Sequence, residues 1–318
     1  MLHIHISIID STNEYARKMG KQSGESDYKI YNFKQDEKVI CLYEAHRYPD
    51  KIQSLTAALN SSDFCIWVID KVDSIFAQTA LALWLKNLPG MIIFTKSISP
   101  EQVEPILKNS PMWQWEKFES PTDNELRKKL LSLNIPSKES PNTALVDSCF
   151  AVGGVGTVAL TKVLSGKFKV HEDVTIIPGN VRTAIRSIQE QDEDTKETSP
   201  SSRAGFSLKN ITPDKVKRGA YLTNSTEIKA FTKGKVKFSV HPLIKGEISP
   251  KSDLFFAWDL QYVAAKINFE KITASDREKE FSFELVTESA AKENQQILIL
   301  RNAKSPKIIA SGTISNLE

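Results

Sequence analysis

Cysteine is scarce in this chain of 318 residues, which holds only Cys41, Cys65 and Cys149. No pair has C-x-x-C spacing, and each lies in an apolar run typical of a strand, so we expect three small buried residues and no metal or redox site. The sequence also lacks any apolar run near the about 20 residues that cross a bilayer, and it begins without a basic and then apolar leader. These absences predict a cytoplasmic protein without a membrane partner.

A strong net charge is also missing, because 42 Lys and Arg oppose 39 Asp and Glu. The basic residues are unevenly placed, and ten of them lie between Lys209 and Lys251. Such a segment suits a phosphate backbone, so RNA, rather than DNA, is the nucleic acid that we expect. The alternative is an ordinary solvated strand face, since three of the lysines alternate with less polar residues. The candidate RNA-binding residues are Lys209, Lys215, Lys217 and Arg218.

Residues 1–136 alternate the patterns of strands and helices. Phe64 to Ile69 is almost wholly apolar, as in a central strand that is covered on both faces. Ser11 with Glu14, and Thr122 with Glu125, have the spacing of capping boxes and predict helix starts. The alternation predicts a mostly parallel sheet with helices on both sides. The expected strands are Ile4 to Ile8, Tyr28 to Phe33, Lys38 to Tyr43, Phe64 to Ile69, Met91 to Thr95 and Met112 to Phe118.

A polar segment bounded by prolines, Pro136 to Asn142, predicts a domain boundary. Beyond it the helical period disappears, and short alternating strands are typical of barrels or sandwiches. Val146 to Val158 predicts a hairpin around Gly153 to Gly156; a phosphate-binding glycine loop is the alternative, but strands flank these glycines on both sides and no helix follows. Gln189 to Arg203 is acidic and rich in Ser and Thr, which predicts an exposed mobile loop.

Two parts of this β-rich region carry a family resemblance. The hairpin, with Leu164 to Val170 after it, resembles the opening of the second domain of elongation factor Tu-type translational GTPases, including the selenocysteine-specific elongation factors. Arg203 to Ile211 with Lys217 to Leu222 is similar to the strands that close that domain. The resemblance implies a P-loop-GTPase-like α/β domain over 1–136 and β-barrels over 143–223 and 224–318. The last strands, Gln296 to Arg301 and Ile309 to Ile314, are similar to the terminal hairpin of the family.

The nucleotide motifs of that family are missing here. A phosphate loop, G-x-x-x-x-G-K-[ST], would occupy Asp10 to Arg17, but both glycines and the lysine are absent. The D-x-P-G element falls at Glu44 to Pro49 without its glycine, and the guanine-reading N-K-x-D falls at Thr95 to Ile98 without Asn or Asp. We therefore expect no nucleotide, no cofactor and no catalytic residue. The degenerate nucleotide positions are Asp10, Tyr15, Ala16, Arg17, Thr95 and Lys96.

Three further positions bear on function through the resemblance. His46 lies near the catalytic histidine of the family, but without a phosphate site we interpret it as a surface loop residue. The family holds the aminoacyl end of tRNA on its second barrel. Where the family usually has an arginine in the glycine turn, this chain has Val155, and where it usually has a glutamate before the closing strand, this chain has Lys215. Lys215 in place of the glutamate cannot accept a hydrogen bond from a ribose hydroxyl; the alternative is that it binds a phosphate.

Three functions remain open from the sequence. The first is a pseudo-GTPase that acts in translation by binding tRNA or the ribosome through its barrels. The second is a protein-interaction scaffold that merely retains the fold and binds a protein partner. The third, an enzyme that hydrolyses GTP through unconventional residues, is the least favoured because the phosphate cradle, the lysine and the base reader are all absent.

Overall fold

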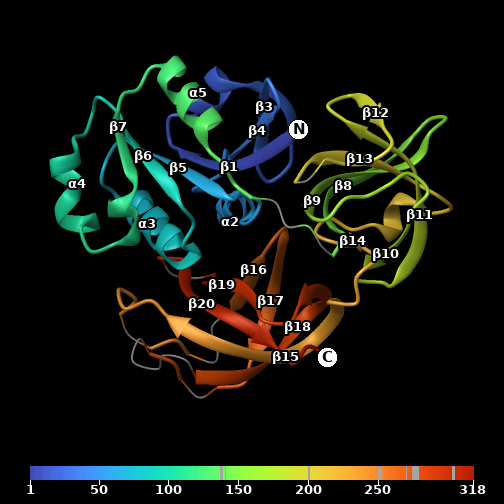
Figure 1. Cartoon of the computed structure of the whole chain (residues 1–318). Coiled ribbons are helices and arrows are strands. Elements are labelled where there is room, and N and C mark those ends of the chain that lie inside the picture. The colour runs from blue at the N-terminus through green and yellow to red at the C-terminus, as the bar shows by residue number, and fades with distance from the viewer. Residues whose placement is uncertain are drawn as a thin grey trace.

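The computed structural model describes residues 1–136, 139, 141–199, 201–245, 247–249, 253–269, 271–273, 279–302 and 305–318. Figure 1 shows three bodies that follow one another along the chain: an α/β domain in blue to green, a β-barrel in green to yellow, and a second β-barrel in orange to red. This α/β plus all-β architecture is the predicted one. Three residues of the expected linker, and Lys251 of the basic segment, lie outside the described residues.

The α/β domain is built on a seven-stranded sheet of order β2-β3-β4-β1-β5-β6-β7. Strands β4, β1, β5, β6 and β7 run parallel, whereas β2 and β3 pair antiparallel at one edge. All six residues of β5 are buried, as its apolar sequence predicts. The strands are β1 Leu2–Asp10, β2 Lys21–Glu25, β3 Lys29–Gln35, β4 Lys38–Glu44, β5 Phe64–Ile69, β6 Gly90–Phe94 and β7 Glu116–Glu119.

Side-chain caps set several of the helix starts. Asp73 accepts the amides of Ile75 and Phe76 at the start of α3, and the predicted Thr122–Glu125 capping box begins α5. The box expected from Ser11 and Glu14 is wrong, because the first helix begins only at Tyr15. The strand expected from Met112 is also partly wrong, since residues 111–114 form a 3-10 turn before β7. The helices are α1 Tyr15–Met19, α2 Ile52–Asn60, α3 Ser74–Lys86, α4 Pro100–Leu107 and α5 Asp123–Ser132.

The second body is a six-stranded barrel in which β10 and β11 close the ring, with β12 added outside it. The predicted hairpin is present as β8 and β9, joined through Gly153 to Val155. Cys149 lies half-buried toward the tip of β8, so the prediction of three buried cysteines is wrong there, whereas Cys41 and Cys65 are buried. The strands are β8 Thr143–Val152, β9 Gly156–Ser165, β10 Asp173–Ile177, β11 Val181–Glu190, β12 Glu193–Thr195, β13 Arg203–Leu208 and β14 Tyr221–Thr223.

The expected mobile loop from Gln189 to Arg203 is wrong in most of its length. Residues 189–195 lie in the hairpin of β11 and β12. Thr198 is 2% exposed and accepts the amide of Phe168, while the buried Glu190 accepts the amide of Ser199. These hydrogen bonds hold in place a segment whose composition is typical of disorder.

The third body is a closed barrel of order β15-β18-β17-β16-β19-β20. The long first strand, the Asp253 to Ile267 pair and the terminal hairpin are all present as predicted. The 14-residue strand β18, which pairs with both β15 and β17, was not predicted. The strands are β15 Ile228–Val240, β16 Leu254–Trp258, β17 Gln261–Ile267, β18 Lys279–Lys292, β19 Gln295–Arg301 and β20 Ile308–Ser315.

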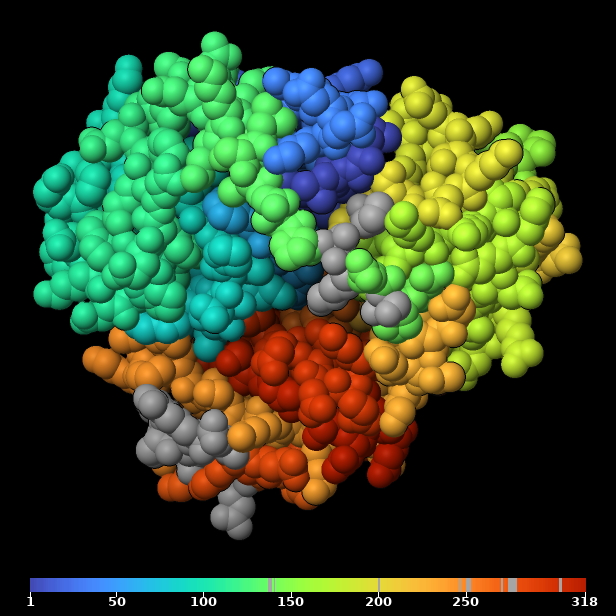
Figure 2. Space-filling model, viewed as in Figure 1, coloured from blue at the N-terminus to red at the C-terminus, as the bar shows by residue number. Residues whose placement is uncertain are grey.

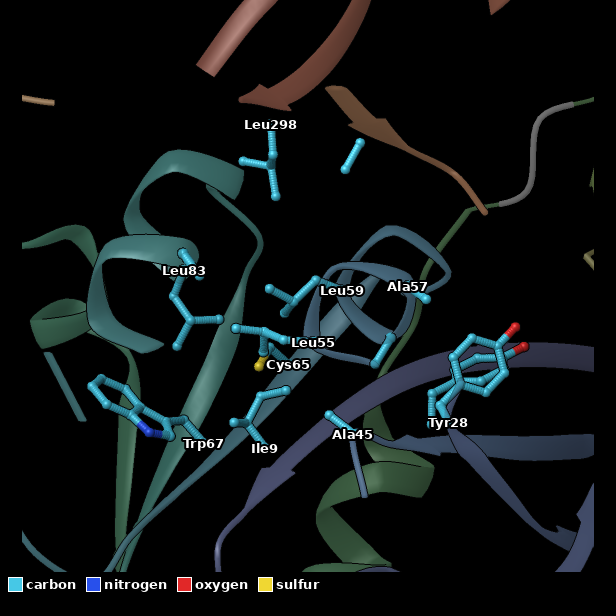
Figure 3. Packing of buried hydrophobic residues seen from close by; sticks show 14 of the residues in the cluster. Ile9, Tyr28, Ala45, Leu55, Ala57, Leu59, Cys65, Trp67, Leu83 and Leu298 are labelled. Carbon is cyan, nitrogen blue, oxygen red and sulfur yellow. The ribbon is translucent and has the colours of Figure 1, made fainter. Parts of the chain in front are cut away.

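An apolar cluster joins the α/β domain to the third body. Figure 3 shows Leu298 of β19 above Leu83 of α3 and Leu59 of α2. Leu81, also on α3, packs into the core of the third body. The three bodies meet closely in the space-filling view of Figure 2. Within the part of the chain that the structure describes, no helix has the length and apolar character to span a membrane.

Candidate functional site

The loop after β1 is closed around the carboxylate of Asp10. Its Oδ1 accepts from the amide and the hydroxyl of Thr12 at 2.8 and 2.7 Å, and its Oδ2 accepts from the amides of Glu14 and Tyr15 at 2.9 and 3.1 Å. Asp10 is only 7% exposed. In a phosphate loop, backbone amides at this place would point at the ligand oxygens. Here the carboxylate of Asp10 accepts the hydrogen bonds of these amides instead.

The neighbouring degenerate positions offer no replacement for the missing motifs. Ala16 is buried, whereas Tyr15 is half-buried and Arg17 is exposed. Thr95 donates its hydroxyl to Asp70 Oδ1 at 2.9 Å, and Lys96 is exposed. The loop after β6 therefore presents a hydroxyl that is already bonded, rather than the carboxylate that would accept hydrogen bonds from a base.

A cavity of about 310 Å³ lies next to Asp10, at the carboxyl ends of β1 and β5. Ligands of α/β sheets bind in crevices at such strand ends. Aromatic rings of Trp67 and Phe76 line this cavity, together with three carboxylates and Lys71 as its one described cation. This excess of negative charge is unfavourable for a polyphosphate. The carboxylates are those of Asp10, Asp70 and Asp73.

His46 is more enclosed than a surface loop residue. Its side chain is 13% exposed, and its Nε2 lies 3.2 Å from Glu25 Oε1. Burial lowers the pKa of His46, against the opposing effect of Glu25. Glu25 of β2 therefore holds the His46 ring against the α/β domain.

A buried ion-pair network, absent from the sequence predictions, joins the α/β domain to the second barrel. Asp147 on β8 accepts from Arg203 Nη2 at 3.2 Å and lies 3.4 Å from Arg218 Nε. Arg218 also donates to Asp27 Oδ2 at 2.8 Å, across the domain interface. The Arg203 guanidinium lies 6.0 Å from the ring centre of Tyr43 on β4. Charged groups that are this enclosed persist only when they are paired.

Histidine contacts extend the same interface along β1. His5 Nε2 donates to the carbonyl of Ser201 at 2.5 Å, while its Nδ1 accepts from the Tyr43 hydroxyl at 2.7 Å. Burial, and then the charge of Lys162, lower the pKa of His5 well below its usual value. Burial also lowers the pKa of His3 from 6.5 to about 4, although Glu190 opposes this change. Both rings are therefore neutral at pH 7.

Acid is expected to weaken the fold through these two histidines. A pKa that is depressed in the folded state means that the unfolded chain binds the additional proton, so the free energy of unfolding decreases as pH falls from about 6.5 toward 4. For His3 alone the decrease between pH 7 and pH 5 is about 2 kcal/mol. Urea denaturation of wild type and His3→Asn at both pH values measures it. An identical pH dependence in the variant would show that His3 is not the source.

The candidate RNA-binding residues do not form one exposed cluster. Lys215 and Lys217 are exposed on the segment before β14, and Lys215 lies 3.5 Å from Asp214. Lys209 is half-buried after β13, and Arg218 belongs to the domain interface. On β15, exposed lysines alternate with buried residues, and two of them pair with acids, Lys229 with Glu293 and Lys235 with Glu280. Of the four candidates, Lys215 and Lys217 are thus the exposed ones.

An α/β domain followed by two six-stranded barrels is the architecture of three-domain translation elongation factors. The crystal structure of translation elongation factor SelB from Methanococcus maripaludis, in complex with the GTP analogue GppNHp, superimposes with a TM-score of 0.83. The match covers 99% of this chain and 79% of that chain at 21% sequence identity.

Sequence comparisons agree with the architecture, and this chain belongs to the elongation factor Tu-like family of translation factors. The family model for elongation factor Tu domain 2 matches residues 156–223. An uncharacterized protein of Methanocaldococcus jannaschii is 30% identical over 274 residues, which cover 85% of this chain and 88% of that protein. The selenocysteine-specific elongation factor of that organism is 27% identical over 280 residues. The alignment covers 80% of this chain but only 59% of that protein.

Proposed function

We propose that this chain acts in translation as a pseudo-GTPase, binding tRNA or the ribosome through its β-barrels without a nucleotide cycle. The observation that carries the proposal is the Asp10 carboxylate, which satisfies the amides that a phosphate would need. A bound nucleotide would have to displace this carboxylate and then lie beside its negative charge. Family membership supports the role in translation, and we expect the protein to work in the cytoplasm, with no enzymatic activity.

Guanine nucleotides are expected not to bind the purified chain. A fluorescent GTP analogue is titrated in the presence of Mg²⁺, and we expect no saturable change in anisotropy up to about 100 μM protein. Asp10→Ala should not restore binding, because the lysine and the guanine reader are still missing. Saturable binding at micromolar concentration, competed by GTP but not by ATP, would contradict the pseudo-GTPase proposal and favour an unconventional GTP-hydrolysing factor.

RNA affinity is expected to depend on the exposed lysines of the second barrel. The double variant Lys215→Glu and Lys217→Glu should weaken binding of a tRNA by about tenfold and reduce the salt slope by roughly two, because each lysine contacts a phosphate. Arg218 is left intact, since its reversal would break the pair with Asp27. Filter binding over a range of salt concentrations measures both quantities.

A matched control reverses two exposed lysines of the α/β domain, Lys108 and Lys128, and should leave RNA binding unchanged. Equal losses in both double variants would indicate a general charge effect and remove the assignment to the barrel. Absence of salt-dependent RNA binding in the wild type would favour the alternative function, a protein-interaction scaffold.

A further inference from the structure

A cavity of about 320 Å³ lies where the three bodies meet, and each body supplies part of its wall. The α/β domain contributes His3 of β1 and the end of α2, the second barrel contributes Lys162 of β9, and the third body contributes Asp259 from the turn after β16. Figure 1 shows α2, β14 and the turn after β16 close together near the centre of the molecule. Among the described residues, neither the Asp10 loop, nor the tip of the β8–β9 hairpin, nor the lysines before β14 line this cavity.

Two side chains of the α/β domain bring unsatisfied polar atoms to the wall. His3 is 2% exposed, and neither of its ring nitrogens has a hydrogen-bond partner among the described residues. The amide nitrogen Nδ2 of Asn60 is enclosed and is likewise without a partner in the described part of the chain. A buried polar group that lacks a partner costs about 1–3 kcal/mol, so such groups indicate a place that a further molecule occupies.

The buried lysine of the wall already has an acidic partner. Lys162 is 7% exposed, its Nζ donates to the carbonyl of Ser61 at 2.7 Å, and it lies 3.4 Å from Asp63 Oδ2. The His3 ring is neutral at pH 7, because burial lowers its pKa to about 4. This side of the cavity therefore offers hydrogen bonds without a net charge.

The remaining charged groups of the wall have both signs. Asp259 accepts the hydroxyl of Tyr221, which is 1% exposed. Glu227 and Lys292 are exposed and of opposite charge. An anion in the cavity would face three carboxylates, and a cation would face two ammonium groups, so neither sign of charge is favoured. An uncharged ligand meets no such opposition.

Hydroxyl groups fit the free hydrogen-bonding positions of the wall. The amide nitrogen of Asn60 can only donate, whereas the neutral ring of His3 has one nitrogen that donates and one that accepts. A hydroxyl group both donates and accepts, so a molecule with several hydroxyl groups can satisfy all three positions. The cavity volume of about 320 Å³ lies within the range of small-molecule sites, about 300–1,000 Å³.

We propose that this cavity binds a small uncharged molecule with several hydroxyl groups, of the size of a monosaccharide. Its hydroxyl groups pair with the Asn60 amide and with both ring nitrogens of His3, in place of water. Because all three bodies supply the wall, the molecule binds only their docked arrangement and stabilises it. This inference does not depend on the proposed role in translation, so the two can fail separately.

The test uses the full chain at pH 7 with D-ribose and D-glucose as uncharged probes, followed by ligand-observed NMR. At least one of the two sugars should bind saturably with a dissociation constant below about 1 mM, and its phosphate ester should bind at least about tenfold more weakly. His3→Phe, and separately Asn60→Leu, should each weaken the sugar by about tenfold, since each removes hydrogen bonds to it. Both changes remove unsatisfied polar atoms, so the thermal midpoint of the free chain should not fall.

The matched control, Asn109→Leu, makes the same change of side chain at an exposed position after α4, outside the cavity wall, and should bind the sugar as wild type does. The proposal is overturned if neither sugar binds at up to about 10 mM, which would leave water as the occupant. It is also overturned if both cavity variants bind as wild type does, or if Asn109→Leu loses as much affinity as they do. Tighter binding of ribose 5-phosphate than of ribose would overturn it as well, because the cavity would then be an anion site.

Discussion

Asp147→Ala is expected to lower the free energy of unfolding by about 3–5 kcal/mol, the usual effect of removing one partner from a buried ion pair. The Asp147 side chain is 6% exposed and lies between Arg203 and Arg218, whose side chains are 14% and 28% exposed. Without the carboxylate two enclosed guanidinium groups repel each other, and among the described residues Arg218 alone of the two keeps an acidic partner, Asp27. Urea denaturation at pH 7, followed by circular dichroism and by tryptophan fluorescence, measures the change.

The control for this prediction is Asp214→Ala, which removes an exposed carboxylate from the same barrel. Asp214 lies 3.5 Å from Lys215, and both side chains are more than 60% exposed. The expected loss is below about 1 kcal/mol, because exposed pairs contribute little. If the two variants lost equal stability, the network around Asp147 would not hold the interface.

Local patterns in the sequence were sufficient for most strands and helices. The alternation of isoleucines in β1, the apolar run of β5 and the Thr122–Glu125 capping box each depend on neighbouring residues, and each is confirmed. The first helix was predicted too long because Asp10 competes with Ser11 and Glu14 for the backbone amides. Pro111 begins a 3-10 turn where an apolar pattern suggested a strand.

Long-range contacts explain what the sequence could not show. Asp147 follows the apolar run of β8, and its partner Arg203 is 56 positions away. Arg218 and Asp27 are 191 positions apart, so their pairing depends on how two domains dock. The basic segment suggested Arg218 as an RNA contact, yet its interface partners became visible only in three dimensions. The missing nucleotide motifs were apparent in the sequence, but the carboxylate that takes their place was not.

The arrangement of the three bodies is expected to be the same with GTP, with GDP and without nucleotide. Ligands shift a conformational equilibrium only through different affinities for its states. Here the contacts between bodies are made by the protein itself. The Asp147 network joins the α/β domain to the second barrel, and α3 packs against the third body. In that second contact Leu81 is 5% exposed, and the amide of Lys307 donates to the side chain of Gln78. Small-angle scattering should give a radius of gyration near about 20 Å in all three conditions, as for a compact chain of this length.

Leu81→Asp provides the matched variant with a large expected effect. Because Leu81 packs into the core of the third body rather than into its own domain, a carboxylate there is unfavourable only while the two bodies are docked. We expect the third body to separate and the radius of gyration to increase by several ångströms, while the circular dichroism spectrum stays native. A change on adding GTP to the wild type would instead identify a nucleotide-regulated factor. An unchanged radius in Leu81→Asp would show that the α3 contact does not fix the arrangement.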